Sequence, residues 1–362
     1  MRTYNYLSNE LPRELIELYS DIEQDVLRVI VKELKKGTAP EEVFAKIQDK
    51  VKGKEKEAEK VLAMMFADSK KKAVKDGRKD FDKDEQNEPV DNNNANSLIA
   101  PMVIAGMAIL AELNKKIINS AMNEYSQDYI QTRNERQKSA LSGFSSGFDE
   151  LQRIYKKLAN KGISIYESFG GGKGRNYSIE NVIRRDVMYK VNQANAKVNK
   201  ENFNKSSAKF IETSSHPTAR TWNKYMKHPY EDHSSWQGKV FYSRDGEKVE
   251  GYEEFESTCG YGELLGIGGI NCYHQFEMNY TGDSSATQYS EKEVERQYAL
   301  SQEQRSYERA IRQLKSVRAV YESAGDEQMT KQLNKSISMA TSRLRNFCET
   351  NGLKYYNWRT QI

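Results

Sequence analysis

Residues 228–243 read HPYEDHSSWQGKVFYS, and this stretch contains two of the chain's 4 histidines, His228 and His233. They stand beside a Trp-Gln-Gly-Lys run that leads into GKVFYS, residues 238–243. The aromatic and β-branched residues of that run predict a β-strand. The stretch therefore predicts a small β-containing region, and its histidines are candidates for metal binding, for catalysis or for hydrogen bonds that hold loops together.

The sequence on both sides of this stretch is also unusual for the chain. All 4 His, two of the 3 Cys and two of the 3 Trp fall between residues 216 and 274. AKFIETSS, residues 208–215, predicts a second strand. CGYGELLGIGGINCYH, residues 259–274, is so rich in glycine that it predicts loops with short pieces of strand.

A glycine-rich segment and a helix precede this region. SFGGGKGRNYS, residues 168–178, predicts a turn, and it does not fit a phosphate-binding P-loop because Gly174 follows Lys173. Ser178 is placed to cap the next helix. Six apolar residues share one face of that helix, which predicts that this face is buried: Ile179, Ile183, Val187, Val191, Ala194 and Val198.

The N-terminal part of the chain predicts long helices. Apolar residues recur at helical spacing from residue 10 to 36 (Leu11, Leu15, Leu18, Ile22, Val26, Val29 and Leu34), and Gly37 is placed to end the helix. Thr38 and Glu41 have the spacing of a capping box for the next helix. The interleaved charges of residues 50–86 predict a solvated helix face, and residues 87–97, NEPVDNNNANS, predict a polar linker.

Residues 98–160 again predict helix, beginning with the most apolar run of the chain, Leu98–Ala111. A bilayer span needs about 20 apolar residues, so this shorter run predicts a buried helix. At the C-terminal end, Tyr307, Ile311, Leu314 and Tyr321 form an apolar seam on one helix, and residues 327–349 predict a second. These two helices predict a hairpin.

The amino-acid composition limits the kinds of protein that this chain can be. The chain has 362 residues, of which 37% are hydrophobic and 30% charged, a balance that favours extended helices with solvated faces. Its 56 basic and 52 acidic residues leave a net charge of +4, so attraction to DNA would have to come from local patches. An odd set of 3 Cys argues against a disulfide scaffold and for a reducing compartment. The first residues lack the pattern of a signal peptide, and we expect synthesis in the cytoplasm.

These observations predict a mainly α fold with a small α+β, loop-rich domain and long amphipathic helices at both ends. We divide the chain into an N-terminal helical region (1–92), a central helical region (93–167), an α+β domain (168–282) and a C-terminal helical hairpin (283–362).

Three interpretations of the rare residues compete. Zinc would need Cys259, Cys272, His274 and either His233 or His228, but the Cys-x-His spacing is not that of a usual zinc knuckle. Catalysis would use Cys272 with a histidine and Asn271, or His216 with Asp232, without a recognisable motif around either. The interpretation that we favour is structural, with no metal or cofactor, because a loop-rich domain needs His, Asn and Gln side chains to satisfy backbone groups.

Several short motifs occur in an order that resembles the tailed-phage minor capsid protein 2 family. In chain order they are residues 159–193, IETSSHPTAR (211–220), HSSWQGKVFYS (233–243), CGYGELLGIGGINCYHQF (259–276), QEQRSYERAIRQLK (302–315) and SAGDEQ (323–328). The family's signature positions correspond to Arg184, Asn192, Gln193, His216, Ala219, Arg220, His233, Trp236, Gln237, Gly238, Lys239, Tyr261, Gly262, Asn271, Cys272 and His274. The chain departs from the family pattern at Tyr273, where a basic residue is usual, and in the inserted TWNKYMKHPYED (221–232).

The resemblance implies a structural minor head protein of a tailed bacteriophage rather than an enzyme. It implies association with the portal protein and other capsid proteins inside the head, in head assembly and DNA packaging or ejection, without a membrane during assembly. The expected location is the virion, in the capsid interior or near the portal, after synthesis in the bacterial cytoplasm.

Local basic residues are the candidate contacts with packaged double-stranded DNA or an acidic portal surface. Residues 173–209 carry nine Lys or Arg against three Asp or Glu. The candidates are Lys173, Arg175, Arg185, Lys190, Arg305, Arg309, Arg312 and Lys315. Two alternatives stay open: a metal-dependent hydrolase or nuclease that uses His216, His233, His274 and Cys272, and a nucleic-acid-binding scaffold component that is lost from mature particles.

Overall fold

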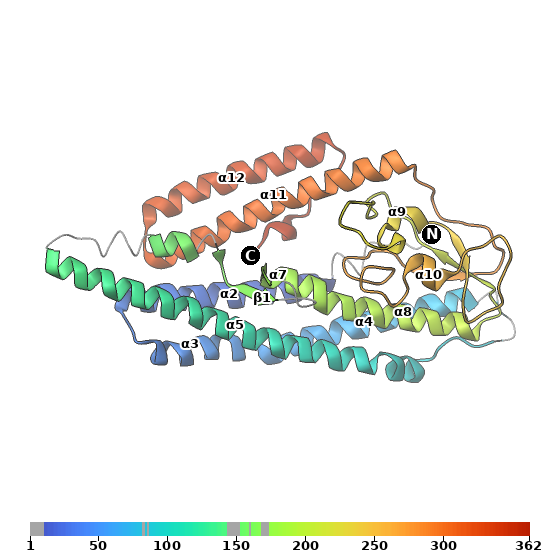
Figure 1. Cartoon of the computed structure of the whole chain (residues 1–362), viewed down its shortest axis with the longest axis horizontal. Helices are drawn as coiled ribbons and strands as arrows, with labels where there is room; N and C mark the ends of the chain where they lie inside the picture. Colours follow the sequence, from blue (N-terminus) through green and yellow to red (C-terminus); the bar gives the residue numbers. More distant parts are fainter. Residues whose placement is uncertain (1–10, 82–83, 85–86, 143–152, 159–160, 168–173) are drawn as a thin grey trace. The chain divides into compact units, whose positions relative to one another are not determined.

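The computed structural model describes residues 11–81, 84, 87–142, 153–158, 161–167 and 174–362 (Figure 1). The described chain is mainly α-helical with small antiparallel sheets, which confirms the predicted fold class. It divides into two compact units, and each unit combines three stretches of sequence. The first unit comprises Met1–Arg13, Lys60–Ile109 and Ile183–Gln302, and the second comprises Glu14–Glu59, Leu110–Val182 and Glu303–Ile362.

Helix α2 spans Leu11–Lys36, as its apolar spacing predicts. Leu15, Ile22 and Val26 are at most 1% exposed, so this spacing marks a buried face. The helix ends at Gly37, whose φ of 74° lies in the left-handed region that favours glycine.

Helix α3 spans Pro40–Lys52, and the predicted capping box at its start is wrong. Ala39 is the N-cap residue and makes no side-chain hydrogen bond to the helix. The Thr38 hydroxyl instead donates to Glu33 Oε2 at 2.7 Å. Pro40 supplies a preset φ at the first helical position, which starts the helix without a side-chain cap.

Helix α4 spans Glu55–Phe81 and helix α5 spans Asn92–Ser142, so the polar linker is shorter than predicted. The predicted linker reached residue 97, whereas α5 begins at Asn92. Asp91 explains the difference, because its Oδ1 accepts the Asn94 N–H at 2.7 Å and caps the helix.

The apolar run Leu98–Ala111 lies in α5, and the prediction that it is buried is wrong for most of its surface. Ile99 is 5% exposed, but Ile104 is 70% exposed. The run packs on one side only, where Gly106 lies against Phe66 of α4. By length and composition the helix could cross a membrane, and 22% of its most apolar 18-residue window is buried.

A two-stranded antiparallel sheet occupies part of the segment that predicted only a turn. Strand β1 (Ser164–Glu167) pairs with β2 (Arg175–Ser178). Residues 168–173 of the predicted turn lie outside the described residues. The next helix follows at once: α7 (Ile179–Val182), the π-helical turn η1 (Ile183–Val187) and α8 (Met188–Lys205). The predicted cap is present, since the Asn181 N–H donates to Ser178 Oγ at 3.3 Å.

The six-residue apolar face predicted for this helix is confirmed, because all six side chains are at most 2% exposed. Both predicted strands are confirmed as β3 (Phe210–Thr213) and β4 (Val240–Tyr242). They form a three-stranded antiparallel sheet with β5 (Phe276–Asn279), in the order β4-β3-β5.

Short helices and turns complete this region: η2 (Pro229–Glu231), α9 (His233–Trp236) and α10 (Phe255–Cys259). The short strand pieces predicted within residues 259–274 are absent from that described segment, which consists of turns after α10. Its repeated glycines explain this, because Gly260, Gly262 and Gly268 have φ values of 62°, 89° and 71°.

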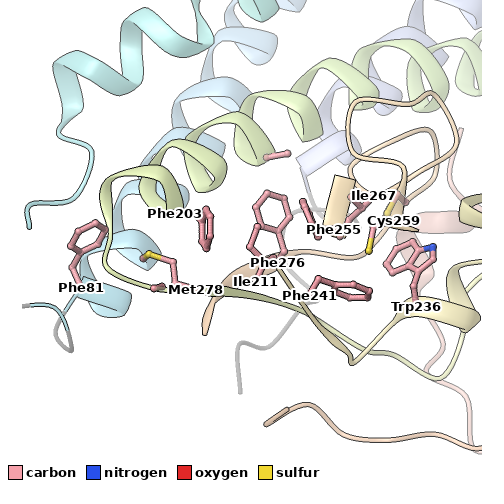
Figure 2. Packing of buried hydrophobic residues seen from close by; sticks show 13 residues of the cluster. Phe81, Phe203, Ile211, Trp236, Phe241, Phe255, Cys259, Ile267, Phe276 and Met278 are labelled. Atoms are coloured by element: carbon pink, nitrogen blue, oxygen red, sulfur yellow. The ribbon is translucent and has the colours of Figure 1, made fainter. Parts of the chain in front are cut away.

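One hydrophobic core lies under the three-stranded sheet and α8. Figure 2 shows its aromatic rings, with Phe81 and Trp236 at the two ends. Phe255 and Phe276 face each other with ring centroids 4.8 Å apart. Ile211 of the central strand is fully buried in the same core. The sheet, α10 and α4 therefore share one packed interior.

The C-terminal helices α11 (Glu291–Ala324) and α12 (Glu327–Thr350) form the predicted hairpin (Figure 1). Ile311 of α11 packs with Leu344 and Cys348 of α12. Asp326 caps α12 by accepting the Met329 N–H at 3.0 Å. The short helix η3 (Asn357–Thr360) follows near the end of the chain.

Candidate functional site

The candidate site is built around α9, whose first residue is His233. Asp232 caps this helix, since its Oδ1 accepts the Ser234 N–H at 3.1 Å. At the other end the Trp236 indole N–H donates to the Tyr230 carbonyl at 3.0 Å. The second contact fixes the orientation of the Trp236 indole, and the side chains of His233 and Trp236 are both 1% exposed.

Gln237 and Gly238 carry the chain from α9 to β4 and connect separate segments. Gln237 Oε1 accepts the His216 backbone N–H at 2.9 Å and lies 3.2 Å from His274 Nε2. Gly238 has a φ of 65°, and a Cβ there would lie 3.2 Å from Ser215 Cβ. A side chain at this position would therefore be both strained and crowded.

The loop before β5 supplies Cys272 and His274. Asn271 precedes them with a φ of 54°, a left-handed conformation that asparagine tolerates better than most residues. Cys272 Sγ lies 3.8 Å from His274 Nδ1 and accepts the His274 backbone N–H at 3.4 Å. The geometry of this turn therefore places the thiol and the imidazole on the same side of the chain.

The carbonyl of Leu265 joins this loop to the rest of the site. It accepts a hydrogen bond from His233 Nε2 at 2.8 Å and one from Arg220 Nη1 at 3.1 Å. Arg220 Nη2 also donates to the Ile270 carbonyl at 2.6 Å. An imidazole and a guanidinium thus supply the hydrogen-bond donors that these loop carbonyls need.

Aromatic contacts fill the space between the histidines. The rings of His216 and His274 stack with centroids 4.3 Å apart, and Trp236 meets His274 edge-on at 4.6 Å. His233 lies 5.2 Å from His274 in the same edge-on manner. The cluster is therefore a continuous packed body of rings.

Three of these side chains offer metal-ligand atoms at close range. One ligand atom each of His233, Cys272 and His274 lies within 4.8 Å of the other two. Cys259, which the sequence placed in a possible zinc set, is buried in α10 and is not a member of this group. Cys259 and Cys272 both belong to the hydrophobic core, and of these two only Cys272 lies beside the two histidines.

Burial determines the protonation states of His233, His274 and Cys272. It lowers the pKa of His233 to about 3, with a further contribution from Arg220. It also lowers the pKa of His274 well below its usual range, with the charges of His216 and His233 adding to the effect. Burial raises the pKa of the Cys272 thiol. At neutral pH the two imidazoles are therefore neutral and the thiol is protonated, which is not the state of an activated nucleophile.

The structure brings together most but not all of the signature positions. His216, Arg220, His233, Trp236, Gln237, Cys272 and His274 contact one another through the bonds and rings above, and the Asn192 amide reaches the Cys272 carbonyl at 3.4 Å. Gln193 instead bonds to the Tyr189 hydroxyl at 2.5 Å. Arg184 lies half-buried on η1, and Lys239 is exposed with its backbone N–H on Thr213 Oγ1 at 3.2 Å.

The basic candidates have very different surroundings. Arg175 and Arg309 are exposed, whereas Arg185 pairs with Asp186 at 2.6 Å. Arg312 pairs with Glu180 at 2.9 Å and also donates to the Arg359 carbonyl. Lys190 is half-buried and donates a hydrogen bond to the side chain of Gln193, and Lys315 donates one to Gln361 at 2.7 Å. Arg305 is half-buried, and Lys173 lies outside the described residues.

Two buried charges were not singled out from the sequence. Lys200 is 5% exposed and lies 2.7 Å from Asp245 and 3.0 Å from Glu256, so it neutralises acids instead of adding to a basic surface. Glu212 of β3 is 4% exposed and accepts the backbone N–H groups of Ser285 and Ala286. The sequence signal for Glu212 was an acidic residue inside the strand predicted over residues 208–215. No sequence signal marks Lys200.

The second unit contains a cavity of about 190 Å³. Glu23 of α2 lines it and accepts the Ile163 N–H at 2.8 Å. Burial raises the pKa of Glu23 to about 7, and the nearby Glu180 adds to this rise. Other lining residues are Lys161, Ser178, Arg309, Arg312 and Ile362.

Comparison with known protein families gives a match over nearly the whole chain. The family described as phage minor capsid protein 2 matches residues 5–349. A search of curated proteins found no match, and neither did a search of solved structures.

Proposed function

We propose that this chain, which belongs to the phage minor capsid protein 2 family and is thus a structural protein of the phage head, associates with the portal protein inside the capsid. There it acts in head assembly and in DNA packaging or ejection. The observation that carries the proposal is the extent of the match, because residues 5–349 include both helical ends as well as the histidine cluster.

The physical character of the cluster supports an architectural role. His233, Cys272 and His274 are 1%, 3% and 5% exposed, and their polar atoms engage the chain's own loops. Such bonds make the loop region rigid, and a rigid surface loses less conformational entropy when it binds a partner. This region is therefore well suited to hold a fixed contact in an assembly.

The exposed cations supply the proposed contact with phosphate or with an acidic surface. Arg175 and Arg309 are the exposed members among the described candidates. By contrast, Arg312 is paired with Glu180, and Arg185 is paired with Asp186. Contacts of exposed cations with a charged partner weaken as salt rises, because counterions compete for the phosphates.

Imaging of purified particles tests the location. Asymmetric reconstruction of the virion, with cross-linking mass spectrometry, should place the chain inside the head and link it to the portal protein. Copies distributed over the shell with no portal cross-links would contradict portal association, and absence from mature particles would indicate the scaffold alternative.

Charge reversal tests the cationic contact. Arg175→Glu combined with Arg309→Glu should reduce DNA or portal binding and flatten its dependence on salt, while Lys335→Glu on exposed α12 serves as the control. Equal binding by both variants would exclude these two arginines from the contact.

The rival function is a metal-dependent hydrolase or nuclease. The ligand chemistry of His233, Cys272 and His274 favours it, whereas their burial opposes it because a substrate must reach the metal. Hydrolysis of DNA or cell wall that disappears with a chelator and with His274→Asn would establish the rival.

A further inference from the structure

The buried group of His233, Cys272 and His274 has the hydrogen-bond pattern of a metal site. We propose that these three side chains bind one Zn²⁺ ion, which ties α9 to the loop before β5. This proposal rests on the geometry of the cluster and is independent of where the chain lies in the particle.

The tautomers of the two histidines favour metal binding. His233 Nε2 lies 2.8 Å from the Leu265 carbonyl, which can only accept, so Nε2 carries the proton. His274 Nε2 faces Gln237 Oε1, the same oxygen that accepts the His216 backbone N–H. Each imidazole therefore keeps its lone pair on Nδ1. A metal-bound histidine commonly donates its other ring N–H to a carbonyl or a similar oxygen.

Backbone N–H groups surround the sulfur of Cys272. Cys272 Sγ accepts the His274 backbone N–H at 3.4 Å, and backbone N–H groups of Gly268 and Gly269 also favour the negative sulfur. Backbone donors of this kind hold the sulfur in place in the way that hydrogen bonds orient metal ligands in general. A bound Zn²⁺ ion would displace the thiol proton to solvent and provide the opposite charge.

The distances are close to those of a bound ion. With Zn–S of about 2.3 Å and Zn–N of about 2.0–2.1 Å, ligand atoms of a tetrahedral site lie roughly 3.3–3.7 Å apart. Cys272 Sγ lies 3.8 Å from His274 Nδ1, and one ring nitrogen of His233 lies within 4.8 Å of the ligand atoms of the other two side chains, so shifts of about 1 Å would bring the three side chains to coordination distances. Three protein ligands leave the fourth position for water or a further donor.

The chemical types of the three proposed ligands indicate which metal ion they would bind. Two imidazoles and one thiolate suit Zn²⁺, whereas Ca²⁺ and Mg²⁺ prefer oxygen ligands. The competing explanation is a metal-free contact in which the Cys272 thiol donates to His274 Nδ1 across 3.8 Å. The two explanations differ in metal content and in the spectrum of a substituted ion.

The test uses the full-length purified chain. We expect about one zinc per chain by elemental analysis. After exchange with Co²⁺ we expect d–d bands together with a thiolate-to-cobalt charge-transfer band in the near ultraviolet. Cys272→Ser should lose the charge-transfer band, whereas Cys259→Ser, a control at another buried thiol, should keep it. Gln237→Ala, which removes the side-chain partner of both His274 Nε2 and the His216 backbone N–H, should lower metal affinity by about 10- to 100-fold.

Two results would overturn the proposal. One is a folded wild-type chain that takes up neither zinc nor cobalt in a stoichiometric amount. The other is a charge-transfer band that survives in Cys272→Ser. Chelation of the wild-type chain covers the case in which Cys272→Ser fails to fold: a melting temperature that falls with chelator and recovers with added Zn²⁺ supports the site, and an unchanged one contradicts it.

Discussion

A half-buried carboxylate can have a strong influence on stability, and Glu23 is an instructive case. Its Oε1 accepts the Ile163 N–H, and a Cβ at the adjacent Gly162 would lie 2.6 Å from the same oxygen. Burial raises the pKa of Glu23 from 4.5 to about 7. The folded chain therefore binds the Glu23 proton more tightly than the unfolded chain does. The stability gained from this proton is complete below the unfolded pKa and is lost as the pH rises through about 7.

Glu23→Gln should remove this pH dependence, because glutamine keeps the oxygen acceptor but carries no charge. Relative to wild type, the free energy of unfolding of the variant should rise by about 1–3 kcal/mol between roughly pH 5 and pH 8. Urea unfolding at several pH values measures this difference. Glu14→Gln, an exposed change on the same helix, is the control and should follow wild type. A parallel course for wild type and Glu23→Gln would contradict the raised pKa.

At the scale of elements, α5 shows how an apolar sequence can be only partly packed. Its side toward Phe66 is covered, and Ile99 is 5% exposed, while Ile104 is 70% exposed. Ile99 and Ile104 are therefore the same residue type in a buried and an exposed position of one helix, so substitutions at the two positions can be compared directly.

Ile99→Ala should destabilise the chain by about 2–4 kcal/mol, because it leaves a cavity in a packed interface. Ile104→Ala should change stability by less than about 0.5 kcal/mol, because little of its surface is buried. Chemical denaturation of both variants measures the difference. Equal losses at the two positions would mean that the outer side of α5 is covered in solution.

The elements differ in how well the sequence predicts them, for physical reasons. The apolar faces of α2 and of the α7–α8 helix were predicted because only one face of each helix is apolar, and periodicity identifies that face. The exposure of α5 was missed because the run Leu98–Ala111 is apolar on every side of the helix, so the sequence does not show which side is buried. Hairpin β1–β2 was missed because four-residue strands carry too little alternation.

The candidate site was predicted in part for a similar reason. Rare residue types marked His233, Trp236, Cys272 and His274, but the partners of Trp236 and His233 are the carbonyls of Tyr230 and Leu265. Every residue has a carbonyl, so the sequence contains no sign of which ones are used.

At the scale of the whole molecule, the units do not follow the order of the sequence. The first unit needs Lys60–Ile109 as well as Ile183–Gln302. The Ser207 N–H donates to Asp84 Oδ2 at 2.6 Å, and the Val90 N–H to Asn202 Oδ1 at 2.8 Å. Phe81 also belongs to the core of the sheet region. The division into four consecutive regions remains a prediction about organisation along the chain.

A fragment of residues 168–282 should therefore be less stable alone than when it is co-expressed with residues 60–109. We expect proteolysis of the isolated fragment to be faster by about tenfold or more, since each 1.4 kcal/mol lost raises the open population tenfold. Pulse proteolysis of both samples checks this. Equal rates would show that α4 is dispensable for this core.

The burial of every cysteine has a practical consequence. Cys259, Cys272 and Cys348 are all enclosed in the folded chain. A maleimide dye should therefore leave the native protein unmodified and react at one cysteine introduced on the surface. A single fluorophore attached in this way would let an observer follow the protein in individual virions while the genome leaves the particle.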